Sequence, residues 1–182
     1  MAWPWVVALA FVLIVFGLYL SMTAGRLDRL HQRIDTSSLA LDALLLRRSA
    51  VALELATSGV MDPASAIVIA EAAHAARTAG DHDDLVRASA ESALTLALVI
   101  TLGEQEELAL IRASESGTEL LAELGAACRR SELGRRFLND AVRACRDVRG
   151  QFVVRVFRLA GHAPWPQSWE MDDTVPVGLT ER

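Results

Sequence analysis

The sequence predicts an all-α protein, in which one N-terminal transmembrane helix precedes an antiparallel helical bundle of about four to five helices. Residues 2–20 form an uncharged apolar run, and no charged side chain precedes Arg26. Later segments repeat apolar residues at helical spacing and are separated by Gly or Asp-Pro signals. The 182 residues are enough for one hydrophobic core beyond the anchor.

The apolar run has the length and the flanks of a membrane span. About 20 apolar residues cross the hydrocarbon core of a bilayer. Trp3 and Trp5 at one end and Tyr19 at the other lie where interfacial aromatic side chains are enriched. A cleaved signal peptide is the main alternative, but it has a basic n-region and a shorter apolar stretch. We therefore expect residues 1–22 to be an anchor that contacts the lipid bilayer through residues 2–20.

Basic residues on one flank predict the orientation of the anchor. Arg26, Arg29 and Arg33 follow the run closely, whereas no basic side chain precedes it. Short flanks rich in Arg stay in the cytoplasm. We expect a single-pass protein of the cell membrane with its N-terminus outside and its helical domain in the cytoplasm.

Residues 23–160 are predicted to form the bundle domain, beginning with a helix from Gly25 to about Ala56 that continues the anchor. Apolar residues recur there at heptad positions, and Ser37 and Arg48 interrupt them; the main positions are Leu27, Ile34, Leu41, Leu44, Val51 and Leu55. Only about four heptads are present, so the stripe favours packing inside a bundle over a homo-oligomeric coiled coil. A homo-oligomer through this stripe stays open.

Four further helices are expected. Asp62-Pro63 is an N-cap followed by proline at the first helical position, and it predicts a helix to about Thr78. A third helix carries the apolar residues from Leu94 to Ile100. An acidic helix is expected from Glu104 to about Cys128 and a basic one from near Ser131 to about Ala160. Residues 161–182 are predicted to be an irregular C-terminal tail.

The last two predicted helices carry opposite charges. Six Glu and one Arg lie between Glu104 and Glu123, and nine Arg lie between Arg129 and Arg158. We expect an antiparallel hairpin in which Arg135 and Arg136 face the acidic helix. The alternatives for the basic stretch are an anionic membrane surface and nucleic acid. No nucleic-acid motif accompanies it, so no nucleic-acid partner is expected.

The residues that carry most enzymatic chemistry are missing or scattered. All 18 basic residues are Arg, which excludes lysine-dependent mechanisms. The four His form no metal-binding pair, and the cluster of His82 with Asp81, Asp83 and Asp84 is interpreted as a helix-capping turn. Cys128 and Cys145 form no CxxC and are expected to be buried, inert thiols. We predict a non-enzymatic protein without cofactor or metal.

A segment of the predicted last helix carries a family resemblance. Arg135, Arg136, Phe137, Asn139 and Asp140 belong to the run RRFLNDAV, which resembles the signature segment of LemA-family proteins. Arg47 and Arg48, in LLRR, resemble that family's Leu-x-Arg-Arg stretch. The chain departs from the pattern where Ser49-Ala50-Val51 replaces an Asp-x-Ile-Pro-Asn element and Leu138 replaces a Tyr.

The resemblance implies a helical bundle with an N-out, C-in anchor, no established enzymatic activity, and roles beside membrane proteases or in the envelope stress response. We predict an anchored scaffold that docks on another membrane protein or complex, with the seven residues of the two signature stretches as an interaction or structural site. The alternative is a membrane-surface or ligand-binding sensor that uses the Arg-rich last helix.

Overall fold

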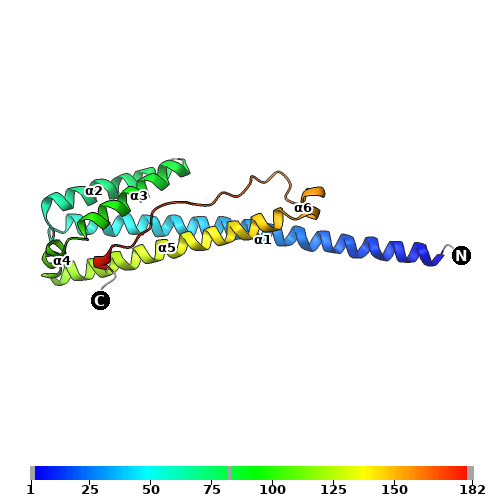
Figure 1. The fold of residues 1–182 in the computed structure, drawn as a ribbon, viewed down its shortest axis with the longest axis horizontal. Coiled ribbons are helices and arrows are strands. Elements are labelled where there is room, and N and C mark those ends of the chain that lie inside the picture. The colour runs from blue at the N-terminus through cyan, green and yellow to red at the C-terminus, as the bar shows by residue number, and fades with distance from the viewer. Residues whose placement is uncertain (1–2, 82, 180–182) are drawn as a thin grey trace. The chain divides into compact units, whose positions relative to one another are not determined.

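The computed structural model describes residues 3–81 and 83–179, and every regular element in that part of the chain is helical. The predicted all-α fold is therefore confirmed. The elements follow one another as shown in Figure 1: α1 (Trp3–Thr57), α2 (Pro63–Thr78), η1 (Ala79–Asp81), α3 (Asp84–Thr101), α4 (Gln105–Arg112), α5 (Glu115–Arg149), α6 (Phe152–Val156) and η2 (Val177–Leu179).

Helix α1 joins the apolar run to the predicted second segment without a break. No proline lies between Pro4 and the end of the helix, and Gly59, with a φ of 74°, follows its last turn. The heptad stripe is used within the chain itself, with four of its positions buried: Leu27, Leu41, Val51 and Leu55. Intramolecular packing thus accounts for the apolar stripe of this helix.

Helices α2 and α3 form a hairpin, side by side (Figure 1). The Asp62 carboxylate accepts hydrogen bonds from the backbone N–H groups of Ala64 (2.8 Å) and Ser65 (3.3 Å), so it caps α2 as expected. The helix ends at Thr78, where the sequence predicted its end. His82, between η1 and α3 in the sequence, lies outside the described residues.

The predicted hairpin between an acidic and a basic helix is wrong. The break lies earlier, at Ala113–Ser114, and α5 runs uninterrupted through the expected turn. Ser114 caps α5, because its hydroxyl accepts a hydrogen bond from Gly117 N–H at 3.0 Å. Ser131, interpreted as a helix start, instead donates its hydroxyl to the Cys128 carbonyl at 2.8 Å and stays inside the helix.

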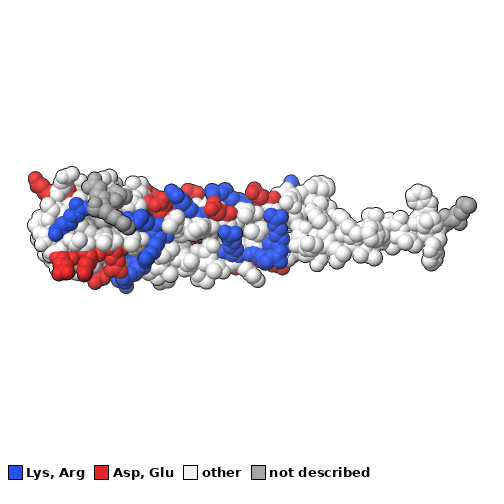
Figure 2. Space-filling model, turned by 90° about the horizontal axis from the view of Figure 1, so that it is seen from below, with Lys and Arg blue, Asp and Glu red and all other residues white. Residues whose placement is uncertain are grey.

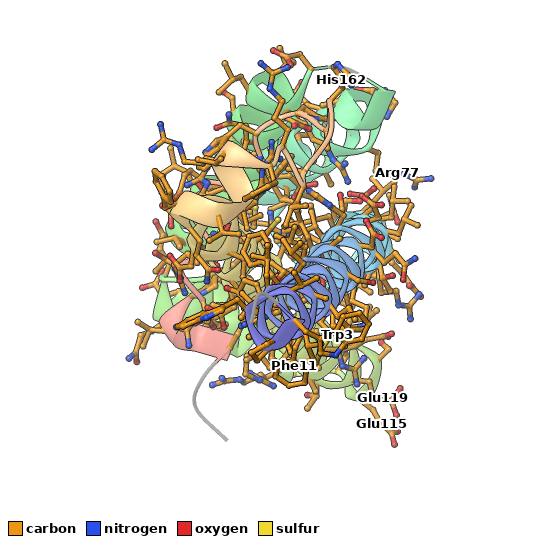
Figure 3. The ribbon with its side chains drawn as sticks, turned by 90° about the vertical axis from the view of Figure 1, so that its right-hand side faces the viewer. Trp3, Phe11, Arg77, Glu115, Glu119 and His162 are labelled. Atoms are coloured by element: carbon orange, nitrogen blue, oxygen red, sulfur yellow. The ribbon has the colours of Figure 1, made fainter. Side chains whose placement is uncertain are left out.

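One continuous helix keeps the acidic and basic segments apart. Arg135 lies 16 residues from Glu119, about 24 Å along the helix axis. Glu115 and Glu119 point outward from α5 (Figure 3). The basic half also ends earlier than expected, since α5 stops at Arg149 before Gly150 and the short α6 follows.

The chain divides into two compact units. Unit 1 consists of the described residues up to Thr36 together with Asn139–Ser168, and unit 2 of Ser37–Leu138 with the described residues from Trp169 onward. Unit 2 holds the main core, which is built from α1, α2, α3, α4, α5 and η2 and centres on side chains such as Leu55, Ile69, Leu98 and Leu124. In unit 1 the buried cluster is small: Leu27, Cys145, Val148 and Val154.

Unit 1 also contains the uncharged part of α1, whose side chains are exposed. Trp3 and Phe11 point outward from the helix (Figure 3). Among the described helices, α1 is long and apolar enough by itself to cross a membrane, and 6% of its most apolar window is buried. The bent pair of α3 and α4 is comparably apolar but turns by 87°. The core of unit 2 accounts for the apolar character of that pair.

Candidate functional site

Arg48, one of the predicted signature residues, is buried in unit 2 and forms an ion pair with Glu91 of α3. One guanidinium nitrogen donates to the Glu91 carboxylate at 2.5 Å and to the Glu91 carbonyl oxygen at 2.9 Å. Both side chains are 2% exposed. The charged residue that interrupts the α1 stripe therefore faces a matching charge inside the bundle, where an unpaired ion would be strongly unfavourable.

The C-terminal tail covers this ion pair. Arg48 also donates to the hydroxyl of Thr95 at 3.0 Å, and that hydroxyl donates to the backbone carbonyl of Asp172 at 2.7 Å. The backbone N–H of Asp172 in turn donates to the Ser92 hydroxyl at 3.0 Å. One turn of α3 therefore binds the tail backbone on one side and Arg48 on the other.

Arg135, the second signature arginine, holds the next residue of the tail. Its guanidinium donates to both carboxylate oxygens of Asp173, at 2.7 and 3.0 Å. The side chains are 19% and 15% exposed, and the hydrogen bond to Asp173 raises the pKa of Arg135. Such a bidentate pair fixes geometry as well as charge. The partner of Arg135 is therefore Asp173 of the tail and not the acidic helix that the sequence predicted.

An aromatic contact and two further arginines extend the attachment of the tail. Trp169 is 9% exposed, and the Arg87 guanidinium lies 5.4 Å from the centre of its ring. At the far end of the tail, Arg112 donates to the Gly178 carbonyl at 3.0 Å and Arg129 to the Leu179 carbonyl at 3.1 Å. Apart from η2, the described part of the tail has no regular secondary structure, yet its backbone is bound at several points along its length.

A glycine is required where the tail ends. A Cβ on Gly178 would lie 2.5 Å from the Leu102 carbonyl oxygen and 2.5 Å from a Leu108 methyl carbon. Any side chain there would displace η2 from the loop before α4. The last turn of the tail is therefore packed closely on unit 2.

Several of the other predicted site residues lie on the surface. Arg47 pairs with Glu123 on the surface, and Arg136 pairs with Glu132 one turn earlier on α5. Phe137 is exposed, and Asp140 pairs with Arg143 on the surface. Asn139 is buried. Within each signature stretch, the paired arginines therefore divide into one inward and one outward residue.

Sequence reasoning missed the partners of the two inward arginines. Glu91 is the only charged residue between Arg87 and Glu104, in a segment otherwise made of small and apolar residues and hydroxyls. A lone carboxylate on such a helix, together with an arginine in the α1 stripe, is a signal for a buried ion pair. The sequence did not indicate a role for Asp172 and Asp173, because two adjacent acidic residues in an irregular tail are usually exposed to solvent.

The pKa shifts of Glu91 and Asp172 have structural causes, namely burial and hydrogen bonding within the fold. Burial raises the pKa of the Glu91 carboxyl, against the opposing effect of Arg48. The backbone N–H and hydroxyl of Thr174 both donate to the Asp172 carboxylate, at 3.0 and 2.7 Å, and lower its pKa. The Asp172 carboxylate therefore stays ionised at neutral and mildly acidic pH. Its two hydrogen bonds from Thr174 hold this part of the tail in a turn.

The described part of the chain contains no cluster of side chains suited to a metal ion. No three His, Cys, Asp or Glu side chains there come close enough to hold a metal ion. Cys128 and Cys145 are buried and free, as predicted, and burial raises the pKa of both thiols. Neither is activated as a nucleophile.

Comparison with known proteins gives no match: no protein-family model, curated protein or solved structure is significantly similar to this chain. The resemblance of the two arginine stretches to the LemA family stays a prediction. The structure gives these stretches a physical role of their own: Arg135 binds the C-terminal tail directly, and Arg48 binds Thr95, whose hydroxyl donates to the tail backbone.

Proposed function

We propose that this protein is a single-pass, non-enzymatic membrane scaffold, whose cytoplasmic helical unit docks on another membrane protein or complex. The observation that supports it best is the exposed, uncharged start of α1, which continues directly into a bundle with its own core. An 18-residue apolar segment left in water would be strongly unfavourable, and a bilayer removes that cost.

The charge distribution supports the N-out, C-in orientation. Arg26, Arg29 and Arg33 follow the apolar segment, and Figure 2 shows Arg side chains gathered directly beside its uncharged surface. Residues 1–36 and 139–168 contain eight Arg and four Asp, which gives unit 1 a formal charge of +4. Basic residues near a span are retained on the cytoplasmic side.

An unpartnered apolar stripe on α3 is the surface that supports docking on a protein. One face of α3 packs into the core, while the opposite face exposes four large apolar side chains, here called the α3 stripe: Leu85, Val86, Leu96 and Ile100. A helix that is apolar all round is normally covered on both faces. A partner protein of the same membrane would cover the second face.

The alternative, a sensor that uses the Arg-rich last helix, has less support. Six of the nine Arg between Arg129 and Arg158 already hold a carboxylate or a backbone carbonyl of this chain: Arg129, Arg135, Arg136, Arg143, Arg146 and Arg149. The basic stretch serves mainly to hold its own fold together. The LemA-like resemblance is compatible with the scaffold and stays part of the proposal.

Co-purification in mild detergent tests the scaffold function. Leu96→Gln with Ile100→Gln changes the α3 stripe, and Leu39→Gln with Leu110→Gln is the matched control at exposed apolar positions elsewhere in unit 2. Chains that co-purify with the wild type and with the control should be lost from the stripe variant. Identical co-purifying chains from all three proteins would contradict docking through α3.

A further inference from the structure

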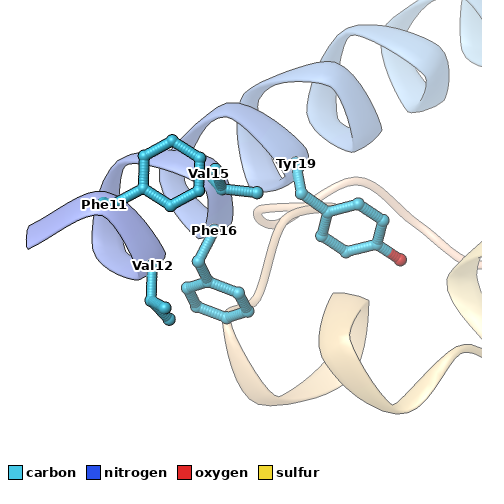
Figure 4. Close-up of a pocket in the computed structure, with 5 residues that line it drawn as sticks. All are labelled: Phe11, Val12, Val15, Phe16 and Tyr19. Atoms are coloured by element: carbon cyan, nitrogen blue, oxygen red, sulfur yellow. The ribbon is translucent and has the colours of Figure 1, made fainter. Parts of the chain in front are cut away.

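The residue that follows α6 contacts the apolar part of α1. The rings of Phe157, which follows α6, and Phe16 of α1 meet edge to face, with their centres 5.3 Å apart (Figure 4 shows Phe16 beside α6). Phe16 lies four residues before Leu20, about 6 Å along the helix axis. Interfacial helices bury their apolar faces about 5–10 Å into the boundary between headgroups and acyl chains.

The side of α6 that faces away from the protein is apolar. Val154 anchors α6 in the small core of unit 1. Phe152 and Val156, one turn apart, point the other way and are 79% and 54% exposed. Phe157 remains about half exposed despite its contact with Phe16. Such a face, continuous with a membrane span, is suited to lipid.

Two arginines flank this apolar face without a carboxylate partner among the described residues. Arg155 and Arg158 are exposed and enter no ion pair within that part of the chain. Arg158 adopts a φ of 49°, at the left-handed position where the Leu159 N–H returns to the Val154 carbonyl (3.0 Å). Glycine is strongly preferred at such a helix end, so an arginine there is retained at a conformational cost.

A shallow groove on α1 adjoins this element. Its volume is about 380 Å³, and five side chains of the apolar segment line it (Figure 4): Phe11, Val12, Val15, Phe16 and Tyr19. Every lining residue is one that the proposed span places at bilayer depth. An acyl chain fits this groove in both chemistry and position.

We propose that α6 is an interfacial membrane element, which immerses Phe152 and Val156 in the leaflet and binds anionic lipid headgroups through Arg155 and Arg158. The inference rests on the proposed membrane span of α1. It assigns the lipid contact to α6 rather than to the basic stretch of α5, most of whose arginines are engaged within the fold. Each arginine near an anionic surface contributes on the order of a five-fold preference for the bound state.

A fluorescent probe on full-length protein in vesicles tests the depth of α6. Val156→Cys carries an environment-sensitive dye, and Leu110→Cys, similarly exposed in unit 2, is the matched control; the native thiols are buried. Vesicles contain phosphatidylcholine alone or with phosphatidylglycerol, each with a spin-labelled lipid as quencher. We expect the dye at position 156 to be quenched and the dye at position 110 to stay unquenched.

Charge variants test the headgroup contact in the same vesicles. Arg155→Gln with Arg158→Gln should lower the ratio of immersed to free α6 by about 30-fold when phosphatidylglycerol is present. Arg158→Gly removes one charge and the backbone strain together, so it should melt no lower than the parent and still lose about five-fold of that ratio. A variant that merely damaged the fold would melt lower.

The outcomes separate the inference from the proposed function. Protein that does not float with the vesicles overturns the membrane span, and the inference with it. Protein that floats while the dye at position 156 stays unquenched overturns only the inference. Equal quenching with and without phosphatidylglycerol overturns the headgroup contact.

Discussion

The two units of this chain obtain their stability in different ways. Unit 2 encloses a large apolar cluster and a buried ion pair, and its tail satisfies the polar groups above that pair. Unit 1 has a small buried cluster of Leu27, Cys145, Val148 and Val154, and it exposes most of the large side chains of its apolar segment. A folded unit in water rarely leaves so much apolar surface uncovered. Unit 2 encloses its apolar core, whereas the apolar surface of unit 1 is exposed and is the surface that the proposed bilayer would cover.

The two units also differ in net charge, and the unit with the exposed apolar surface is the positively charged one. Unit 1 carries +4, and since the whole chain carries −5, unit 2 carries −9. Cytoplasmic leaflets are negatively charged and attract basic segments next to a span. A net negative charge is repelled by such a surface. Apolar exposure and positive charge therefore coincide in the unit that the proposal assigns to the bilayer.

Removing Arg48 is expected to cause the largest loss of stability, and it tests whether the buried ion pair stabilises unit 2. Arg48→Met strands the buried Glu91 carboxylate, so the free energy of unfolding should fall by about 3–5 kcal/mol. Adding Glu91→Leu should recover most of that loss, because an apolar pair replaces the ions. Denaturant unfolding in detergent measures both, and Arg47→Met, at the exposed neighbour, is the control. A double variant as unstable as the single one would show that the pair is not the coupled unit described.

The attachment of the tail gives the next effect. Arg135→Ala removes two charge-assisted hydrogen bonds to Asp173 and should cost about 1.5–3 kcal/mol. Arg136→Ala removes a surface pair within one helix and should cost about 0.3–0.5 kcal/mol. Thermal melting compares the two neighbours directly. Equal melting temperatures would mean that the tail contributes little to unit 2.

The buried carboxylate predicts a smaller, pH-dependent effect. Burial raises the pKa of Glu91 in the folded state above its unfolded value of about 4.3. The folded state therefore holds the proton more tightly, and stability should decrease as pH rises from the unfolded value through the folded one. Glu91→Gln removes this decrease. The free energies of unfolding of the parent protein and of Glu91→Gln, measured from mildly acidic to neutral pH, should converge at the acidic end. Parallel curves would contradict a raised pKa of Glu91 in the folded state.

Local signals in the sequence predicted the start and end of helices in unit 2, but the pairing of segments far apart in the sequence was not predicted correctly. Asp62-Pro63 fixed the start of α2 because a cap and a proline act within one turn. The turn near Ser131 was predicted wrongly, since serine serves equally as a cap or inside a helix. Without that turn, the acidic and basic segments cannot pair.

The candidate site was predicted only in part. Arg48 and Arg135 were selected from the sequence, but their partners lie 43 and 38 residues away. Asp173 belongs to an irregular tail with no periodicity to place it. The predicted helix to about Ala160 is also wrong at its end, because α5 stops at Arg149 and the separate short helix α6 follows, with Phe152 exposed at its start.

The central claim is that unit 1 contains a membrane span and that unit 2 lies in the cytoplasm. It is tested most directly by alkaline extraction of membranes from cells that make the full chain with a cytoplasm-active reporter fused after Arg182. The account predicts a fusion of full mass that stays in the membrane pellet with an active reporter, because the start of α1 spans the bilayer and unit 2 lies inside. A fusion released into the soluble fraction, shortened by about 20 residues, would identify a cleaved signal sequence and contradict the account. So would a full-length fusion in the pellet whose reporter is inactive, since unit 2 would then lie outside.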